Sequence, residues 1–194
     1  AVDYYTRPKA VYYSLSRAYR PLHLSAQYTK QVWAGQEIFQ TGIYGHNSFL
    51  HAQEGELIVA VRDSRGNSYY ETAQSVRLAA NRATLLLEVK IPLDHLGTEL
   101  FFLRLELKTE DGLAADNLYF FTTTTDLAPM FRLGKTKLKI ATAKSNVRWQ
   151  LVIKNSGPET ALLLNLEDRL PLDSLEYAYF SDNHFTLFPG EKKV

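Results

Sequence analysis

Between residues 22 and 123 the chain is a series of short apolar runs separated by turn residues, and this pattern constrains the fold more than any other feature. Each run has the length and the content of β-branched and aromatic residues that strands prefer. Seven such strands in roughly 100 residues are the proportions of an immunoglobulin-like sandwich. The runs cover residues 22–28, 37–44, 57–63, 69–78, 84–91, 100–108 and 117–123.

Two turns predict which of these strands pair. Asp63-Ser64-Arg65-Gly66-Asn67 and Glu110-Asp111-Gly112 each lie between two runs and contain a glycine that can adopt positive φ. We therefore expect two antiparallel hairpins. One joins residues 57–63 to 69–78, and the other joins 100–108 to 117–123.

The segment 122–129 loses the alternation and gains small polar residues and a proline, as expected of a connection between domains. We expect a first sandwich over residues 22–124, a linker over 125–129 and a second β-sandwich domain over 130–194. Further strand-like runs cover residues 137–141, 147–154, 161–167, 177–180 and 185–188. Because so few residues follow the linker, we expect the second domain to be truncated and to lack its final strand or strands.

A single amphipathic helix is predicted over residues 7–19, before the first strand. Val11, Leu15 and Ala18 recur at helical spacing together with Tyr12 and Tyr19, while Pro8 suits the first turn and Pro21 stops the helix. A lone helix of three turns is marginal in water, so its apolar face requires a partner surface. We expect residues 1–21 to pack against a part of the protein upstream of Ala1.

The composition excludes several classes of protein. Of the 194 residues, 45% are hydrophobic, as in a folded globular protein. The 22 Lys and Arg residues nearly balance the 21 Asp and Glu residues, so the chain has no strong electrostatic field. We therefore expect neither nucleic acid nor a membrane as a partner. No apolar stretch approaches the ~18 residues of a membrane span, and the N-terminus lacks a signal pattern. The absence of cysteine excludes disulfides, thiolate ligands and cysteine nucleophiles, but leaves the compartment open.

The candidate polar sites are all weak. Glu54 and Glu56 lie two residues apart in an expected turn, where solvated carboxylates are the simpler interpretation. His46 and His51 are five residues apart in an expected loop and lack a third ligand at suitable spacing for zinc. The chain contains neither a nucleophile elbow nor a phosphate-binding glycine loop. We therefore assign no catalytic, cofactor-binding or metal-binding residue and expect no cofactor.

The two tryptophans raise carbohydrate binding as an alternative, because sugar rings stack on exposed aromatic faces. Trp149 alternates with Arg148 and Gln150 in an apolar strand, so we expect it in the core. Trp33 lies at an expected strand edge and is the better candidate for a sugar contact, although such a residue also serves to cover a neighbouring domain.

Aromatic strands in the two halves follow an Asp-Asn pair, Asp116-Asn117 in the first and Asp182-Asn183 in the second. Two tandem β-domains of similar design would explain the echo. In a chain with 12 Tyr and 10 Phe, coincidence also explains it.

Three segments together resemble a known family. They are Asp3-Tyr4-Tyr5 through Ala18-Tyr19-Arg20-Pro21-Leu22-His23, then Asp116-Asn117-Leu118-Tyr119-Phe120-Phe121, then Ser181-Asp182-Asn183-His184-Phe185 through Pro189-Gly190-Glu191. In this order they are similar to the C-terminal part of glycoside hydrolase family 2 enzymes of the β-mannosidase and exo-β-glucosaminidase type. There, the last helix of the catalytic barrel leads into an immunoglobulin-like domain, and a further β-domain follows.

The resemblance implies a chain without an active site of its own. In that family two glutamates on the barrel carry out retaining hydrolysis of a terminal β-glycoside, and the barrel would precede residue 1. The implied partners are the catalytic barrel of the parent chain and, as an alternative, carbohydrate, and a periplasmic or secreted location is favoured. Gly42-Ile43-Tyr44-Gly45-His46-Asn47 departs from the pattern by its glycines. An autonomous carbohydrate-binding module and a cell-surface immunoglobulin-like interaction module remain the alternative functions.

Overall fold

The computed structural model describes residues 1–145, 148–171 and 178–194, and in these the chain is mostly β-structure. The described residues divide into two compact units. We call Arg20–Leu133 the central unit, and Ala1–Tyr19 with Gly134–Val194 the terminal unit. The expected all-β class is confirmed. The domain boundaries expected at 21, 124 and 129 stay a prediction.

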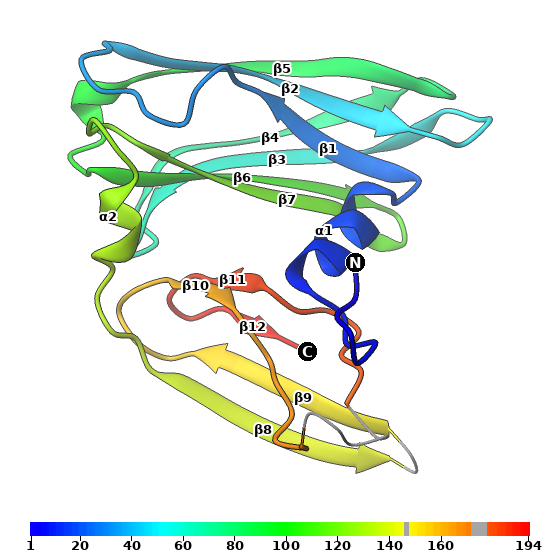
Figure 1. Ribbon diagram of the computed structural model, residues 1–194. Coiled ribbons are helices and arrows are strands. Elements are labelled where there is room, and N and C mark those ends of the chain that lie inside the picture. The colour runs from blue at the N-terminus through cyan, green and yellow to red at the C-terminus, as the bar shows by residue number, and fades with distance from the viewer. Residues whose placement is uncertain (146–147, 172–177) are drawn as a thin grey trace. The chain divides into compact units, whose positions relative to one another are not determined.

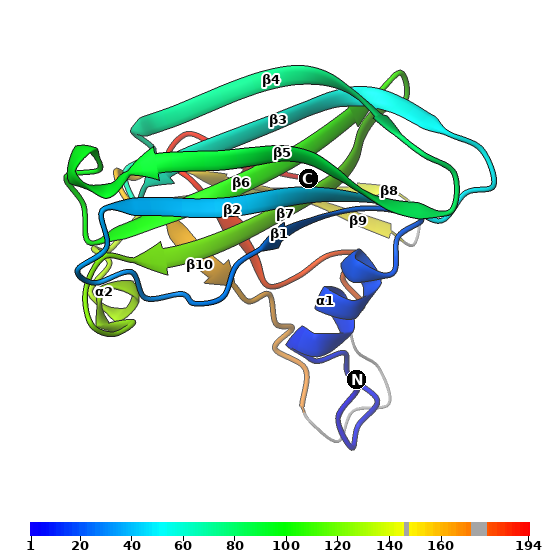
Figure 2. The ribbon, with the colours of Figure 1, turned by 90° about the horizontal axis from the view of Figure 1, so that it is seen from above.

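The central unit is a sandwich of two antiparallel sheets (Figure 1). One sheet has the strand order β1-β2-β5 and the other the order β4-β3-β6-β7. Figure 2 looks onto the first of these sheets, with β2 between β5 and β1. The strands are β1 (Leu22–Gln27), β2 (Ile38–Asn47), β3 (Gln53–Asp63), β4 (Ser68–Leu78), β5 (Arg82–Pro92), β6 (Leu100–Thr109) and β7 (Gly112–Thr122).

Both predicted hairpins are confirmed. Strand β3 pairs with β4, and β6 pairs with β7, each antiparallel. Gly66 and Gly112 have positive φ in the two turns, at 83° and 104°, as the turn chemistry requires. A 3-10 turn, η1 (Leu93–His95), follows β5, and a short helix, α2 (Ala128–Phe131), follows β7.

Aromatic rings form the centre of the sandwich core. Phe39, Phe101 and Phe121 are fully buried, with ring centroids between 4.8 and 5.5 Å apart. One of the two glycines of β2 that depart from the family pattern, Gly45, faces this core. A Cβ atom at Gly45 would lie 2.7 Å from the side chain of Leu78, so any larger residue there would force that leucine to shift.

The terminal unit combines the two ends of the chain. It contains α1 (Ala10–Ala18), a sheet of order β12-β9-β8 and the pair β10-β11. Its strands are β8 (Leu138–Ser145), β9 (Arg148–Asn155), β10 (Ala161–Leu164), β11 (Phe185–Leu187) and β12 (Lys192–Lys193). Ile153, Ala161 and Leu187 form a small buried cluster, against which Leu138, Leu164 and Phe185 pack.

Several local predictions differ from the structure. The helix begins at Ala10, after Lys9 as N-cap, because Pro8 pairs with Val2 in an isolated bridge instead of entering the first turn. Of the strand expected over 177–180, Tyr177 lies outside the described residues, and Ala178 to Phe180 are not in a strand. Val147, expected to begin a strand, also lies outside the described residues.

Candidate functional site

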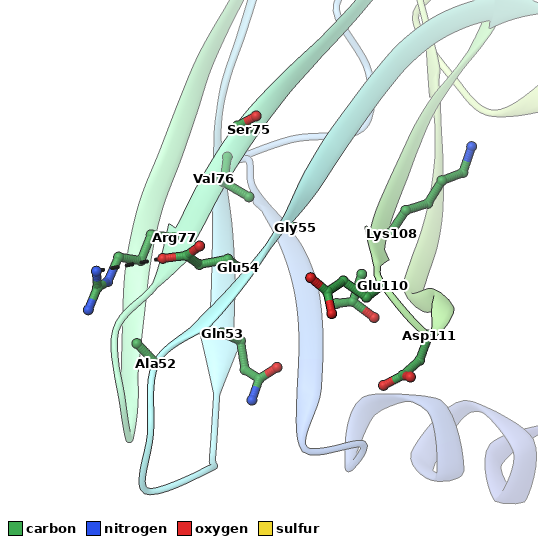
Figure 3. A pocket seen from close by; sticks show the side chains of 11 residues that line it. Ala52, Gln53, Glu54, Gly55, Ser75, Val76, Arg77, Lys108, Glu110 and Asp111 are labelled. Carbon is green, nitrogen blue, oxygen red and sulfur yellow. Dashed lines mark ion pairs between the residues drawn. The ribbon is translucent and has the colours of Figure 1, made fainter.

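The two glutamates singled out in the sequence lie in strand β3, and the expected turn at this position is wrong. Strand pairing continues to Gln53 because β4 is long enough to match it. Glu54 lines a depression of about 720 Å³ at the end of the sheet (Figure 3). Its carboxylate points toward Arg77, with a separation of 3.6 Å between Nη1 and Oε1. Both side chains are more than 70% exposed, so their interaction is weak.

The depression offers no chemistry beyond that of a solvated surface. Glu110 and Asp111 line it from the β6–β7 turn, and Lys108 and Gln53 add polar groups, but none of its lining residues is aromatic. General acid–base chemistry needs carboxyl groups whose environments separate their pKa values, and the open depression provides no such burial. It is not a candidate active site.

The histidine prediction is also corrected. His46 lies in β2, not in a loop, and its register partner on β1 is His23. The two rings are 5.7 Å apart, and the Nε2 atom of His46 lies 2.7 Å from the hydroxyl of Ser25. His51 stacks on Phe49 instead, with ring centroids 5.4 Å apart. The sequence missed His23 because strand register brings it to His46 across 23 residues of chain.

Burial lowers the pKa of His23, and the neighbouring His46 and Arg20 lower it further. Desolvation disfavours the charged imidazolium, and positive neighbours act in the same direction. His23 is therefore neutral around pH 7. Among the described residues no group of three or more His, Cys, Asp or Glu side chains could hold a metal ion.

The burial of the two tryptophans is the reverse of what the sequence predicts: Trp33 is buried and Trp149 is exposed. Trp33 is only 8% exposed, and its ring packs edge-on against Phe39 in the sandwich core, with centroids 5.1 Å apart. It does lie beside the end of β7, where its backbone N–H donates to the carbonyl of Thr122, but the side chain turns inward. Trp149 is 61% exposed, with the Nζ atom of Lys144 5.3 Å from its ring centroid. The core position expected for Trp149 is wrong, and the burial of Trp33 removes it as the candidate for a sugar contact.

The helix α1 has one face fixed to its own unit. Tyr13 is 3% exposed and contacts the ring of His184, with centroids 6.0 Å apart. Arg17 donates to the carboxylate of Asp182 at 2.6 Å and to the carbonyl of Asn183 at 3.2 Å. Near the other end of the helix, the hydroxyls of Tyr12 and Tyr179 are 3.1 Å apart.

The apolar face that the sequence assigned to a partner remains open. Val11, Leu15 and Tyr19 are 49%, 41% and 81% exposed. We call these three side chains the open face of α1. Because the contacts of Tyr13 and Arg17 fix the rotation of the helix, the open face is presented in a defined orientation. It is the best-defined candidate interaction surface of the terminal unit.

No helix among the described residues has the length and the apolar character that a membrane crossing requires.

Comparison with known proteins agrees with this description. Residues 40–125 match the family model of a mannosidase Ig/CBM-like domain. The chain also resembles two solved structures, a β-D-mannosidase from Dictyoglomus thermophilum and an exo-chitosanase from Amycolatopsis orientalis, each over 99% of its length. The TM-scores are 0.73 and 0.70, and the sequence identities are 23% and 15%. No curated protein matches the chain.

The chain spans only 21% of the mannosidase and 25% of the exo-chitosanase. At these identities the likeness shows a shared fold. The resemblance to the C-terminal immunoglobulin-like domains of such glycosidases, inferred from three sequence segments, is thus confirmed for the domain type and the fold.

Proposed function

We propose that this chain is the non-catalytic C-terminal β-sandwich region of a retaining exo-β-glycosidase of glycoside hydrolase family 2, and that it supports the catalytic barrel of that enzyme. The match of residues 40–125 to a mannosidase Ig/CBM-like domain supports this proposal. The shared fold also supports it, because the whole chain resembles one part of a β-mannosidase and of an exo-chitosanase. That part makes up 21% and 25% of those chains. In such an enzyme the two catalytic carboxylates belong to the barrel.

The observation that carries the proposal is the contrast between the two faces of α1. One face is fixed by Tyr13 and Arg17, while Val11 and Leu15 on the open face are between two-fifths and one-half exposed. Burial of apolar area contributes about 25 cal/mol per Å², so covering the open face would contribute several kcal/mol to docking. A free-standing cell-surface module would be expected to cover this helix completely with its own sandwich.

The proposal is tested by the polypeptide encoded upstream of Ala1. We expect it to show the alternating strands and helices of a (β/α)8 barrel and, expressed separately, to bind this chain in trans. The substitutions Val11→Asp and Leu15→Asp should weaken that binding at least tenfold, since each places a charge in an apolar contact. Ile140→Asp, at an apolar position on β8 that is 62% exposed, is the control outside the open face.

Three results would contradict the proposal. The first is an upstream sequence without a barrel pattern, and the second is binding that the two aspartate substitutions leave unchanged. The third is hydrolysis of 4-nitrophenyl β-D-mannoside or β-D-glucosaminide by this chain alone, because the proposal leaves the catalytic carboxylates outside it.

A further inference from the structure

The outer face of sheet β1-β2-β5 presents a defined set of side chains around one tyrosine. In β2 the residues Phe39, Thr41 and Ile43 point into the core, so Gly42, Tyr44 and His46 lie on the outer face. The register places side chains of the two flanking strands beside them. On β1 the neighbours are His23, Ser25 and Gln27, and on β5 they are Ala83, Leu85 and Glu88.

Tyr44 lies over Gly42, the preceding residue on the same face. A Cβ atom added at Gly42 would be 3.2 Å from the Cε2 atom of the Tyr44 ring and 3.3 Å from Leu85. The ring therefore occupies the space that any other side chain at position 42 would need. It lies against the backbone of the central strand at Gly42 and is partly buried, and we call it the Tyr44 platform.

Hydrogen-bonding groups line the platform on the β1 side. Ser25 is the register partner of Tyr44, and its hydroxyl lies 2.7 Å from the Nε2 atom of His46. Gln27 is the partner of Gly42, and its Oε1 atom lies 3.8 Å from the position of a Cβ atom there. Neighbouring strands are about 4.8 Å apart, so these groups can reach a ring stacked on Tyr44. On the β5 side Leu85, 48% exposed, extends the apolar surface.

The face carries little net charge. His23 is neutral at pH 7 because burial, His46 and Arg20 all disfavour its protonation. Glu88 and Lys90 on β5 compensate each other, with 3.8 Å between Oε2 and Nζ. An aromatic ring and a leucine side chain beside hydroxyl, amide and imidazole groups complement an uncharged ligand that has one apolar face and several hydroxyls. A pyranose sugar, with axial C–H groups on one face and hydroxyls at its rim, has this chemistry.

We propose that the outer face of sheet β1-β2-β5 is a binding site for a neutral oligosaccharide, in which one pyranose ring stacks on Tyr44 and its hydroxyls bond to Ser25, His46 and Gln27. The site lies within the central unit and needs no part of a catalytic barrel. It therefore extends beyond the structural support proposed above, and each proposal can fail without the other.

Titration calorimetry on the whole chain tests the site. The probes are mannohexaose and cellohexaose as neutral oligosaccharides, and the glucosamine hexamer as a cationic one. We expect both neutral probes to bind with a Kd on the order of 1 mM and the cationic probe to bind no better. Tyr44→Ala should weaken binding about tenfold, because the stacking surface is lost, while Tyr44→Phe should keep it within about twofold.

Two further variants separate a binding defect from a folding defect. Gly42→Ala retains the tyrosine but places a methyl group under its ring, so binding should fall severalfold with little change in the unfolding midpoint. Tyr4→Ala removes a tyrosine that is 92% exposed outside the proposed site and should bind as the wild type does. The proposal is overturned if neither neutral probe binds at 10 mM (on the order of ten times the expected Kd), or if Tyr44→Ala binds as tightly as the wild type.

Discussion

At the level of single residues, Asp182 joins both ends of the terminal unit. Its carboxylate lies 2.6 Å from Arg17 of α1 and 2.6 Å from Lys193 of β12. Burial alone would raise the pKa of Asp182, but the hydrogen bond and the charge of Lys193, together with Arg17 and the N–H of Asn183, hold it below its ordinary value. A carboxylate with a depressed pKa stabilises the folded state wherever it is ionised.

We predict that Asp182→Asn lowers the free energy of unfolding by about 1–2 kcal/mol at pH 7. The wild-type advantage is complete above the unfolded pKa of ~3.9 and disappears as the pH falls through the lower folded value. Urea unfolding at pH 7 and at pH 3 measures both effects. The control is Asp116→Asn, whose 3.5 Å pair with Arg20 is about 40% exposed and should matter by less than about 0.5 kcal/mol. An equal loss at both pH values would contradict the assigned role.

Asp116 and Asp182 are the aspartates of the two Asp-Asn pairs noted in the sequence, and the asparagines that follow them have similar roles. Asn117 donates its side-chain N–H to the carbonyl of Leu24, and Asn183 donates to the carbonyl of Leu166. Each aspartate also forms an ion pair with an arginine of its own unit, Asp116 with Arg20 and Asp182 with Arg17. The tandem design stays a prediction, because Asn117 lies within a strand and Asn183 precedes one.

At the level of elements, the short apolar runs predicted the strands of the central unit, the turn residues predicted two of its hairpins, and the alternation of apolar residues predicted the buried face of β9. The alternation failed for Trp149, which lies on the same side of β9 as buried Ile153 but is 61% exposed. Alternation identifies the face of a strand, whereas burial depends on whether another element covers that end of it. The same limit applies to Trp33, which follows β1 in a segment without alternation and still enters the core.

The two faces of α1 predict opposite effects of substitution. Tyr13→Ala removes a ring that is 97% buried, and we expect the terminal unit to lose about 3 kcal/mol of stability. Leu15→Ala changes a side chain on the open face, and in this chain alone it should change stability by less than about 0.5 kcal/mol. Thermal unfolding followed by circular dichroism distinguishes the two. A comparable loss from Leu15→Ala would show that the open face is covered within the chain itself.

At the level of the whole molecule, the sequence indicated the class of protein better than it located any site. The order of three motifs was enough to indicate the family resemblance, whereas the expectation that this chain carries no catalytic residue stays a prediction. It could not indicate the Tyr44 platform, since Ser25, Gln27 and Tyr44 meet only through the register of β1 on β2. The available local signal was Gly42 two residues before Tyr44, a spacing that leaves room for an aromatic ring on one face of a strand.

The difference in core size between the two units leads to the last prediction. The central unit buries Phe39, Phe101 and Phe121 among many aliphatic side chains, whereas the terminal cluster consists of Ile153, Ala161 and Leu187 with their partly buried neighbours. Stability rises with the apolar area buried, so the terminal unit should unfold at the lower temperature.

Differential scanning calorimetry should therefore show two transitions. Ile153→Ala should lower only the first, by roughly 10 °C for a loss of about 2 kcal/mol in a unit of this size. Phe101→Ala, which costs about 3–5 kcal/mol in the central core, should lower only the second. Since each substitution lies in the core of one unit, the transition that it leaves unchanged serves as the internal control. A single transition that both substitutions lower equally would show that the two units unfold as one cooperative body.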